Sequence, residues 1–321
     1  MDRRAPRTST MVLGVAGVLA STGTAALGAR NLLNGQAAQA RTVIPKAWDV
    51  PPRADGVYAP GGGPVRRWER GEPYDLHLMV FGDSTATGYG CRDADEVPGV
   101  LIARGLAEES GKLIRLSTKA IVGATSKGLS GQVDAMFVAG PPPDAAIIMI
   151  GANDITALNG IPQSARRLGA AVQRLRDSGA VVVVGTCPDF GVITAIPQPL
   201  RYTARSLGLR LARAQAKAVR AAGGVPVPLA DLLTPNFLER PELMFSDDKF
   251  HPSAAGYALA ANQLLPALCH GLGEWTGATV PDLPWAARTA GRSFTGRLTA
   301  VSRRLRRRTT GVPAPIVVPA S

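Results

Sequence analysis

The chain has 321 residues, of which 45% are hydrophobic and 19% charged, and this composition excludes both a disordered protein and a small disulfide-stabilised one. The formal net charge of +12 would by itself indicate a nucleic-acid or membrane partner. The excess of positive charge lies at the two ends of the chain. Residues 1–70 carry ten basic and four acidic side chains, and residues 281–321 carry eight basic side chains and one acidic side chain. The middle of the chain is close to neutral, so we expect no nucleic-acid partner for it.

The N-terminus has the profile of an export signal. Arg3, Arg4 and Arg7 precede a stretch without charge over residues 8–29. Polar residues dilute the second half of this stretch, which makes it marginal as a membrane span of about 20 residues. A cleaved signal peptide and a retained signal anchor both remain open for residues 1–40. In either case we expect an exported protein that is secreted or associated with the cell envelope.

Residues 41–73 are rich in proline and glycine and show no sustained periodicity, which predicts a linker. The folded domain is predicted over residues 74–275, where apolar runs typical of strands alternate with helical patterns. The expected strands are residues 76–81, 113–116, 145–150, 181–184 and 225–229. The expected helices are residues 100–109, 164–177, 202–222 and 253–269.

The strand pattern indicates the fold class. The expected strands at 145–150 and 181–184 are apolar at every position, as a strand needs when helices cover both faces of its sheet. Strands that alternate with helices predict a parallel sheet between two helical layers, that is, a doubly wound α/β sandwich of three layers. Ligands of such folds bind at the carboxyl ends of the strands.

The C-terminal segment, residues 276–321, is predicted to be an arginine-rich tail. Eight arginines fall between Arg288 and Arg308. On a helix they would surround one apolar stripe, formed by Phe294, Leu298, Val301 and Leu305. An anionic membrane or cell-wall surface is one expected partner of this tail, and a merely solvated helix is the alternative.

Cysteine and histidine are too few and too scattered for a metal site. The chain has three of each, with no C-x-x-C pair and no H-E-x-x-H motif, so no metal is expected. The run of glycines at 61–63 lacks the lysine and the preceding strand of a phosphate-binding loop. We therefore expect no nucleotide cofactor.

Polar groups follow the expected strands at the edge where ligands bind. Ser84 follows the first strand, Gly123 the second and Asn153 the third, while Asp248 and His251 come after the fifth. A serine hydroxyl becomes a nucleophile when a base removes its proton, the base needs an orienting carboxylate, and a tetrahedral oxyanion needs hydrogen-bond donors. The five residues together predict acyl transfer.

Each group has an expected role. His251 is the predicted base, and Asp248, three residues before it, can accept from its other ring nitrogen. Asp247 is an alternative, because a spacing of four residues also reaches the ring, and the family resemblance described below makes it the weaker one. The oxyanion hole is expected to consist of the Ser84 amide, the Gly123 amide and the Asn153 side chain.

Four short motifs resemble the sequence blocks of the SGNH, or GDSL, hydrolase superfamily: Gly82-Asp83-Ser84, Gly123, Gly151-Ala152-Asn153-Asp154 and Asp248-Lys249-Phe250-His251. The resemblance spans Tyr74 to about His270 and is closest in composition to exported esterases of the actinobacterial type. It implies a serine nucleophile, an Asp248–His251 pair, the same oxyanion donors and no metal or organic cofactor. It also implies a flavodoxin-like sandwich with strand order 2-1-3-4-5. Thr85 departs from the fuller Gly-Asp-Ser-Leu motif and leaves fine substrate preference open.

The predicted function is that of an exported serine esterase, which cleaves carboxylic esters through an acyl-serine intermediate. Its expected substrates are small-molecule, lipid or carbohydrate esters with short to medium acyl chains or O-acetyl groups. Two long connections, 188–200 and 234–250, favour an open site with an apolar lining from Phe190, Ile193, Ile196, Leu238, Met244 and Phe245. The alternative is an envelope-binding protein on an inactive scaffold whose basic tail holds anionic lipid or wall polymer. The intact Ser84, Asp248 and His251 argue against that alternative.

Overall fold

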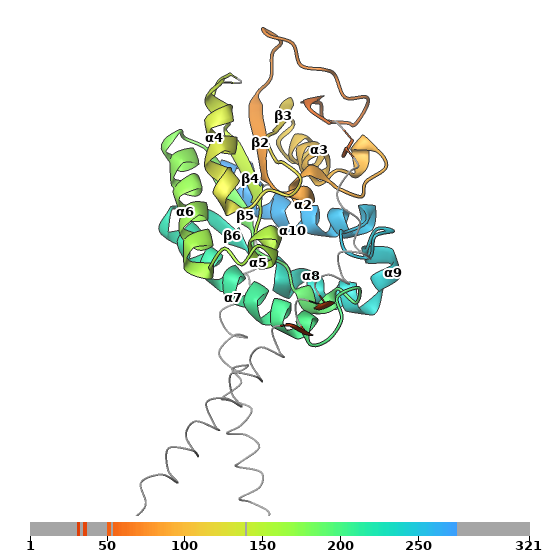
Figure 1. The fold of residues 1–321 in the computed structure, drawn as a ribbon. Helices are drawn as coiled ribbons and strands as arrows, with labels where there is room; N and C mark the ends of the chain where they lie inside the picture. Colours follow the sequence, from red (N-terminus) through yellow and green to blue (C-terminus); the bar gives the residue numbers. More distant parts are fainter. Residues whose placement is uncertain (1–30, 33–34, 37–49, 53, 139, 275–321) are drawn as a thin grey trace, which may run out of the picture. The chain divides into compact units, whose positions relative to one another are not determined.

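The structure is a computed structural model that describes residues 31–32, 35–36, 50–52, 54–138 and 140–274 (Figure 1). The expected signal or anchor stretch at 8–29 and the arginine-rich tail at 276–321 lie outside the described residues. Within the ranges that are described, no helix is both long and apolar enough to cross a membrane.

Across the described residues, six strands form one sheet in the order β1-β3-β2-β4-β5-β6. Their bounds are Gly56–Tyr58 for β1, Leu76–Gly82 for β2, Ile114–Thr118 for β3, Ala145–Met149 for β4, Val181–Gly185 for β5 and Val225–Val227 for β6. Strands β2 to β6 are parallel to their neighbours, and only β1 runs antiparallel, to β3. Without β1 the order is the expected 2-1-3-4-5, so the predicted α/β fold class is confirmed.

Strand β1 shows that the linker expected over 41–73 is wrong for part of its length. Tyr58 pairs with Ile114 of β3 and is buried, and Val57 forms a further bridge with Arg66. Three residues are too few to leave a period-two pattern, and the prolines and glycines on either side are typical of a linker. The part of the chain that joins the sheet therefore begins well before Tyr74.

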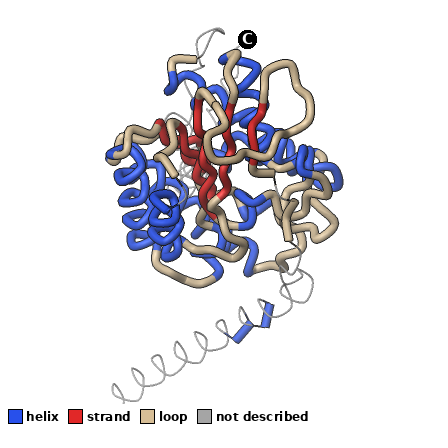
Figure 2. The backbone as a smooth tube through the Cα atoms, turned by 90° about the horizontal axis from the view of Figure 1, so that it is seen from above, coloured by secondary structure: helices blue, strands red, loops and turns tan. Residues whose placement is uncertain are grey.

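Helices cover both faces of the sheet, as Figures 1 and 2 show. One face packs against α3 (Pro98–Ser110), α8 (Leu229–Glu239) and α10 (Ala254–Leu272). The other face packs against α4 (Leu129–Val138), α6 (Ile161–Asp177) and α7 (Leu200–Ala221). The short helices are α2 (Ser84–Thr87), α5 (Ala152–Thr156) and α9 (Pro241–Met244), with 3-10 turns η1 (Ala94–Glu96), η2 (Ser126–Gly128) and η3 (Phe190–Val192).

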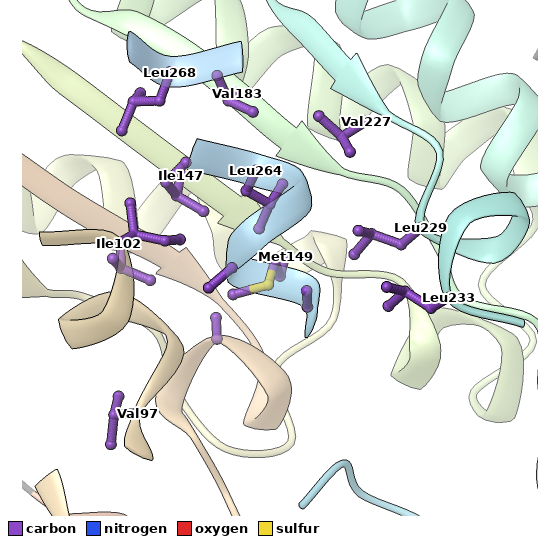
Figure 3. Close-up of a cluster of buried hydrophobic side chains, with 14 of the residues drawn as sticks. Val97, Ile102, Ile147, Met149, Val183, Val227, Leu229, Leu233, Leu264 and Leu268 are labelled. Carbon is purple, nitrogen blue, oxygen red and sulfur yellow. The ribbon is translucent and has the colours of Figure 1, made fainter. Parts of the chain in front are cut away.

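Two buried cores hold the strands in place. Along β2, Leu78 and Val80 point into one core and Met79 and Phe81 into the other, as the two-residue period of a strand requires. Figure 3 shows the first core, with side chains from β4, β5 and β6 facing α10: Ile147, Met149, Val183, Val227, Leu264 and Leu268. Because both faces of the sheet are tightly packed, the carboxyl ends of the parallel strands have fixed positions along one edge of the sheet.

The segment after β6 differs from expectation. The last strand ends at Val227 rather than at residue 229, and α8 and α9 occupy much of the predicted loop at 234–250. Pro235 lies inside α8, where a proline usually argues against a helix. Leu229, Leu233 and Phe237, each four residues apart, pack into the core, and this packing outweighs the local preference of the proline.

Candidate active site

Ser84 lies at the carboxyl edge of the sheet, in the tight turn from β2 into α2. A Cβ at Gly82 would come within 1.9 Å of the Met149 carbonyl oxygen, and Gly82 has a φ of 137°, so this position requires glycine. Asp83 caps α2, because its carboxylate accepts a hydrogen bond from the Thr85 amide at 3.0 Å. The cap is therefore not formed by Ser84, whose hydroxyl is directed elsewhere.

Gln132 of α4 fastens the same turn. Its side-chain amide accepts from the Gly82 N–H and donates to the Gly82 carbonyl, both at 2.8 Å. This glutamine is buried, and its helix neighbours Leu129, Val133 and Met136 are core residues. A polar residue among apolar helix positions is the only sign in the sequence that could have marked it, and nothing there indicates its partner.

His251 connects Ser84 to a carboxylate. Its Nε2 lies 3.0 Å from the Ser84 hydroxyl oxygen, and its Nδ1 lies 2.6 Å from Asp248 Oδ2. Asp247, the weaker candidate, is exposed and pairs with Arg92 at 3.1 Å. The structure thus brings Ser84, His251 and Asp248 together and leaves Asp247 out.

A tight turn holds the Asp248 carboxylate. Its Oδ1 accepts from the amides of Phe250 and His251 and from the Ser246 hydroxyl, each at 2.8 Å. Burial raises the pKa of this carboxyl, but hydrogen bonds from His251 and Phe250 outweigh that effect and lower the pKa to about 2. Asp248 is therefore ionised at neutral pH and accepts a hydrogen bond from the N–H of His251 Nδ1, which leaves Nε2 to accept from the Ser84 hydroxyl.

Aromatic rings surround the imidazole. The ring centroid of Tyr89 lies 4.5 Å from that of His251, and the Phe250 ring lies 5.0 Å from it on an edge. Tyr257 of α10 donates to the Tyr89 carbonyl at 2.7 Å. These rings keep His251 almost fully buried, and no local pattern in the sequence predicts their position.

Asn153 and Gly123 lie on neighbouring turns of the same edge. Asn153 Nδ2 donates to the Ala124 carbonyl at 2.9 Å, which uses one of the two hydrogens on that nitrogen. Gly123 has a φ of 79°, a left-handed conformation that favours glycine although a Cβ would meet open space. The Ile121 amide donates to the Gly82 carbonyl at 3.1 Å, so the Gly123 turn is bonded both to the Ser84 turn and to Asn153.

Asp154 supports Asn153 from behind. Its buried carboxylate accepts from the amide and the hydroxyl of Ser126 at 2.8 and 2.7 Å and from the Ser164 hydroxyl at 2.8 Å. Asn159 donates to the same group at 3.1 Å. This network fixes the start of α5 against η2 and α6, and with it the place of Asn153.

An apolar pocket opens beside Ser84 and His251, with an empty volume of about 950 Å³ that is partly open to solvent. Phe190, Ile193 and Phe245 line it, as the sequence predicted. The other expected lining residues lie elsewhere: Ile196 and Met244 are buried in the core, and Leu238 is exposed on α8. In their place α8 contributes Leu229, Leu233, Thr234 and Phe237.

The remaining titratable groups do not form a second centre in the described part of the chain. No cluster of three or more histidine, cysteine or acidic side chains there could hold a metal ion. Cys91, Cys187 and Cys269 are all free, and burial raises the pKa of Cys91 to about 12. The contacts of Ser84 and Asp248 with His251 give this site a hydroxyl next to an imidazole and a carboxylate.

The sequence and fold are similar to those of known proteins. A sequence model of the GDSL-like Lipase/Acylhydrolase family matches residues 80–259. The chain is 70% identical over 285 residues to the GDSL-like esterase Rv1075c of Mycobacterium tuberculosis (strain ATCC 25618 / H37Rv), covering 89% of this chain and 91% of that relative.

Two proteins of known structure are each 19% identical in sequence to this chain. The esterase EstA from Pseudoalteromonas sp. matches with a TM-score of 0.47 over 62% of this chain and 100% of that chain. The lipase/acylhydrolase from Enterococcus faecalis matches with a TM-score of 0.48 over 64% of this chain and 100% of that chain.

Proposed function

The chain belongs to the GDSL-like lipase/acylhydrolase family and is a carboxylic ester hydrolase, and from this premise we propose that Ser84, His251 and Asp248 are its catalytic residues. One observation carries the proposal, namely the two consecutive contacts from Ser84 Oγ to His251 Nε2 at 3.0 Å and from Nδ1 to Asp248 Oδ2 at 2.6 Å. Such a series activates a hydroxyl that would otherwise be a poor nucleophile.

In the first half of the proposed reaction, His251 Nε2 takes the proton of Ser84 as Oγ attacks the ester carbonyl carbon. The carbonyl oxygen becomes an oxyanion, and the ionised Asp248 stabilises the imidazolium. The imidazolium then gives its proton to the alcohol oxygen as the carbon–oxygen bond breaks. The alcohol leaves, and the acyl group remains on Ser84.

In the second half, His251 takes a proton from water as the water oxygen attacks the acyl carbon. The second tetrahedral intermediate collapses, and the proton returns to Ser84 Oγ as the carboxylic acid departs. We assign the oxyanion to the Ser84 and Gly123 amides and the second N–H of Asn153 Nδ2. The hydrogen bonds that join these three turns support this assignment, because donors fixed in advance need no reorganisation during the reaction.

The pocket supports an acyl chain of short to medium length. Its walls beside Ser84 are apolar side chains of η3 and α8, among them Phe190, Leu233 and Phe237. An O-acetyl group would leave most of this apolar surface uncovered, so an acyl chain of several carbons fits it better. The alcohol part of the ester would face the open side.

We also assign the protein to the cell exterior, secreted or bound to the envelope, on the strength of the basic N-terminus and the uncharged stretch at 8–29. The arginine-rich tail would bind anionic lipid or wall polymer. Deletion of residues 281–321 should then weaken binding to anionic vesicles and leave hydrolysis of a soluble ester intact. Equal vesicle binding with and without the tail would contradict this role.

The Ser84→Ala variant tests the proposed nucleophile. Hydrolysis of 4-nitrophenyl butyrate should fall at least about 10⁴-fold, with an unchanged circular dichroism spectrum. Ser178→Ala is a matched control, because its hydroxyl only bonds the Leu175 carbonyl at the end of α6. Substantial hydrolysis by folded Ser84→Ala would show that another group is the nucleophile.

A further inference from the structure

Exposed apolar side chains lie on segments that follow the carboxyl edge of the sheet, the edge that carries Ser84 and the pocket. Leu158 after α5 is 79% exposed, Leu238 of α8 is 63% exposed and Leu243 of α9 is 47% exposed. Ile121, in the turn of Gly123, is also exposed. The segments follow the carboxyl ends of β3, β4 and β6, and Figure 1 shows α5, α8 and α9 at the same end of the sheet. We call these four residues the mouth surface.

Leu158 is the least expected member of the mouth surface. Its φ of 51° is a left-handed conformation, which costs a leucine free energy that glycine or asparagine would largely avoid. It is among the most exposed large hydrophobic residues in the part of the chain that is described, so it stabilises no core. Neither the backbone conformation nor packing against the described residues explains a leucine at this position.

The N-terminal segment meets the protein at this end. Gln36 donates from its side-chain Nε2 to the Gln198 carbonyl and accepts from the Leu200 amide at 3.0 Å. Both contacts fall in the connection 188–200, which forms a pocket wall, and Figure 1 shows the red residues 35–36 beside it. Six residues lie between the uncharged stretch at 8–29 and Gln36, so the chain from residue 29 to Gln36 can span at most about 25 Å.

We propose that the mouth surface rests on a lipid bilayer and that the ester substrate enters the pocket from that bilayer. The uncharged stretch ends within reach of the pocket wall, and the arginines before it suit anionic head groups. A bilayer would cover the exposed leucines, and its acyl chains match the apolar lining of the pocket, which is partly open to solvent. The inference rests on the proposed export and esterase function and adds the source of the substrate.

The opposite edge of the sheet provides a matched control. Phe137 and Val138 at the end of α4 are 54% and 90% exposed, so they are as apolar and as accessible as the mouth surface. Helix α4 returns from the carboxyl edge toward the start of β4, and Figure 1 shows its end opposite α8 and α9. The proposal assigns these two side chains no lipid contact.

Fluorescence quenching tests the orientation in the full chain. Leu238→Trp and Val138→Trp are each added to vesicles of phosphatidylglycerol and phosphatidylcholine with brominated acyl chains. The emission of each new indole is the difference between the variant and the parent chain. The brominated lipid should quench most of this emission in Leu238→Trp and leave it unchanged in Val138→Trp. Equal quenching of the two, or no quenching of the first, would overturn the proposal.

Kinetics provide an independent readout. Leu158→Asn, Leu238→Gln and Leu243→Gln are combined in one full chain, and hydrolysis of a 4-methylumbelliferyl ester carried in the same vesicles should fall about tenfold or more. Hydrolysis of soluble 4-methylumbelliferyl butyrate should stay close to that of the parent. The combined Phe137→Gln and Val138→Gln chain should match the parent on both substrates.

The two proposals can fail separately. If the parent and Ser84→Ala hydrolyse the soluble ester equally, the proposed nucleophile is wrong. A second outcome is that Ser84→Ala is inactive, but the combined leucine variant and the combined Phe137→Gln and Val138→Gln variant hydrolyse the vesicle-borne ester at equal rates. In that case only the membrane orientation is wrong. A protein partner for the mouth surface would give that second result, because the leucines would then be irrelevant to lipid.

Discussion

Replacement of Gln132 by methionine should destabilise the protein and slow the reaction at Ser84. Methionine has a similar size but removes both hydrogen bonds to Gly82. In this variant the carbonyl of Gly82 still accepts a hydrogen bond from the Ile121 amide. The buried N–H of Gly82, however, loses its partner, because Gln132 supplied it. With a net value of about 1 kcal/mol for the carbonyl bond and about 1–3 kcal/mol for the unsatisfied N–H, the expected loss is about 2–4 kcal/mol.

Urea unfolding measures the loss of stability, and kcat/KM for 4-nitrophenyl butyrate measures the effect on the site. Ser84 is two residues from Gly82, and a misplacement of about 1 Å can cost on the order of 100-fold in rate. Gln173→Met is the matched control, because its amide bonds Asp177 on the exposed face of α6 and should change stability by less than about 0.5 kcal/mol. If both variants behave like the parent, Gln132 does not hold the Ser84 turn.

Three further predictions concern the Asp248–His251 pair. Asp248→Asn should lower kcat by about 10⁴-fold, whereas Asp247→Asn should have little effect, and a reversed order would contradict the assignment. The value of kcat/KM should rise as the pH increases, because His251 must be neutral to take the serine proton, and a flat profile would contradict a histidine base. The lowered pKa of Asp248, to about 2, stabilises the folded state above about pH 4, and this contribution, on the order of 2 kcal/mol, is lost as the pH falls toward 2. Acid unfolding of Asp248→Asn should lack that part of the pH dependence, and an unchanged dependence would show that Asp248 is not its source.

The sequence predicts the residues that lie directly after strands better than those that act from a distance. Ser84 and Asn153 could be placed together because the carboxyl ends of parallel strands meet at one edge, a rule that needs no knowledge of packing. His251 follows β6 only after α8 and α9, so its position beside Ser84 depends on tertiary contacts as well. The strand order and the choice of Asp248 came from the family resemblance. The structure shows why Asp248 fits, since the turn 248–251 directs two backbone amides at that carboxylate.

Tertiary contacts account for what the sequence does not show. Strand β1 depends on pairing with β3, and its three residues carry no pattern of their own. Helix α8 contains Pro235, so the local signal is for a loop, and only the core contacts of its apolar face make it helical. The pocket residues of α8 could not be predicted from the sequence, because the helix that carries them depends on core contacts. The hydrogen bonds between Gln132 and Gly82 could not be predicted either, because they join two distant parts of the chain.

Covalent labelling tests the central claim most directly. A fluorophosphonate ester reacts with an activated serine, with the oxygen–phosphorus bond forming as fluoride leaves, and the adduct can be located by peptide mass spectrometry. We predict one adduct per chain on the peptide that contains Ser84, and none in Ser84→Ala or His251→Ala. An adduct on any other residue, or labelling of Ser84→Ala at the rate of the parent chain, would contradict Ser84 as the nucleophile.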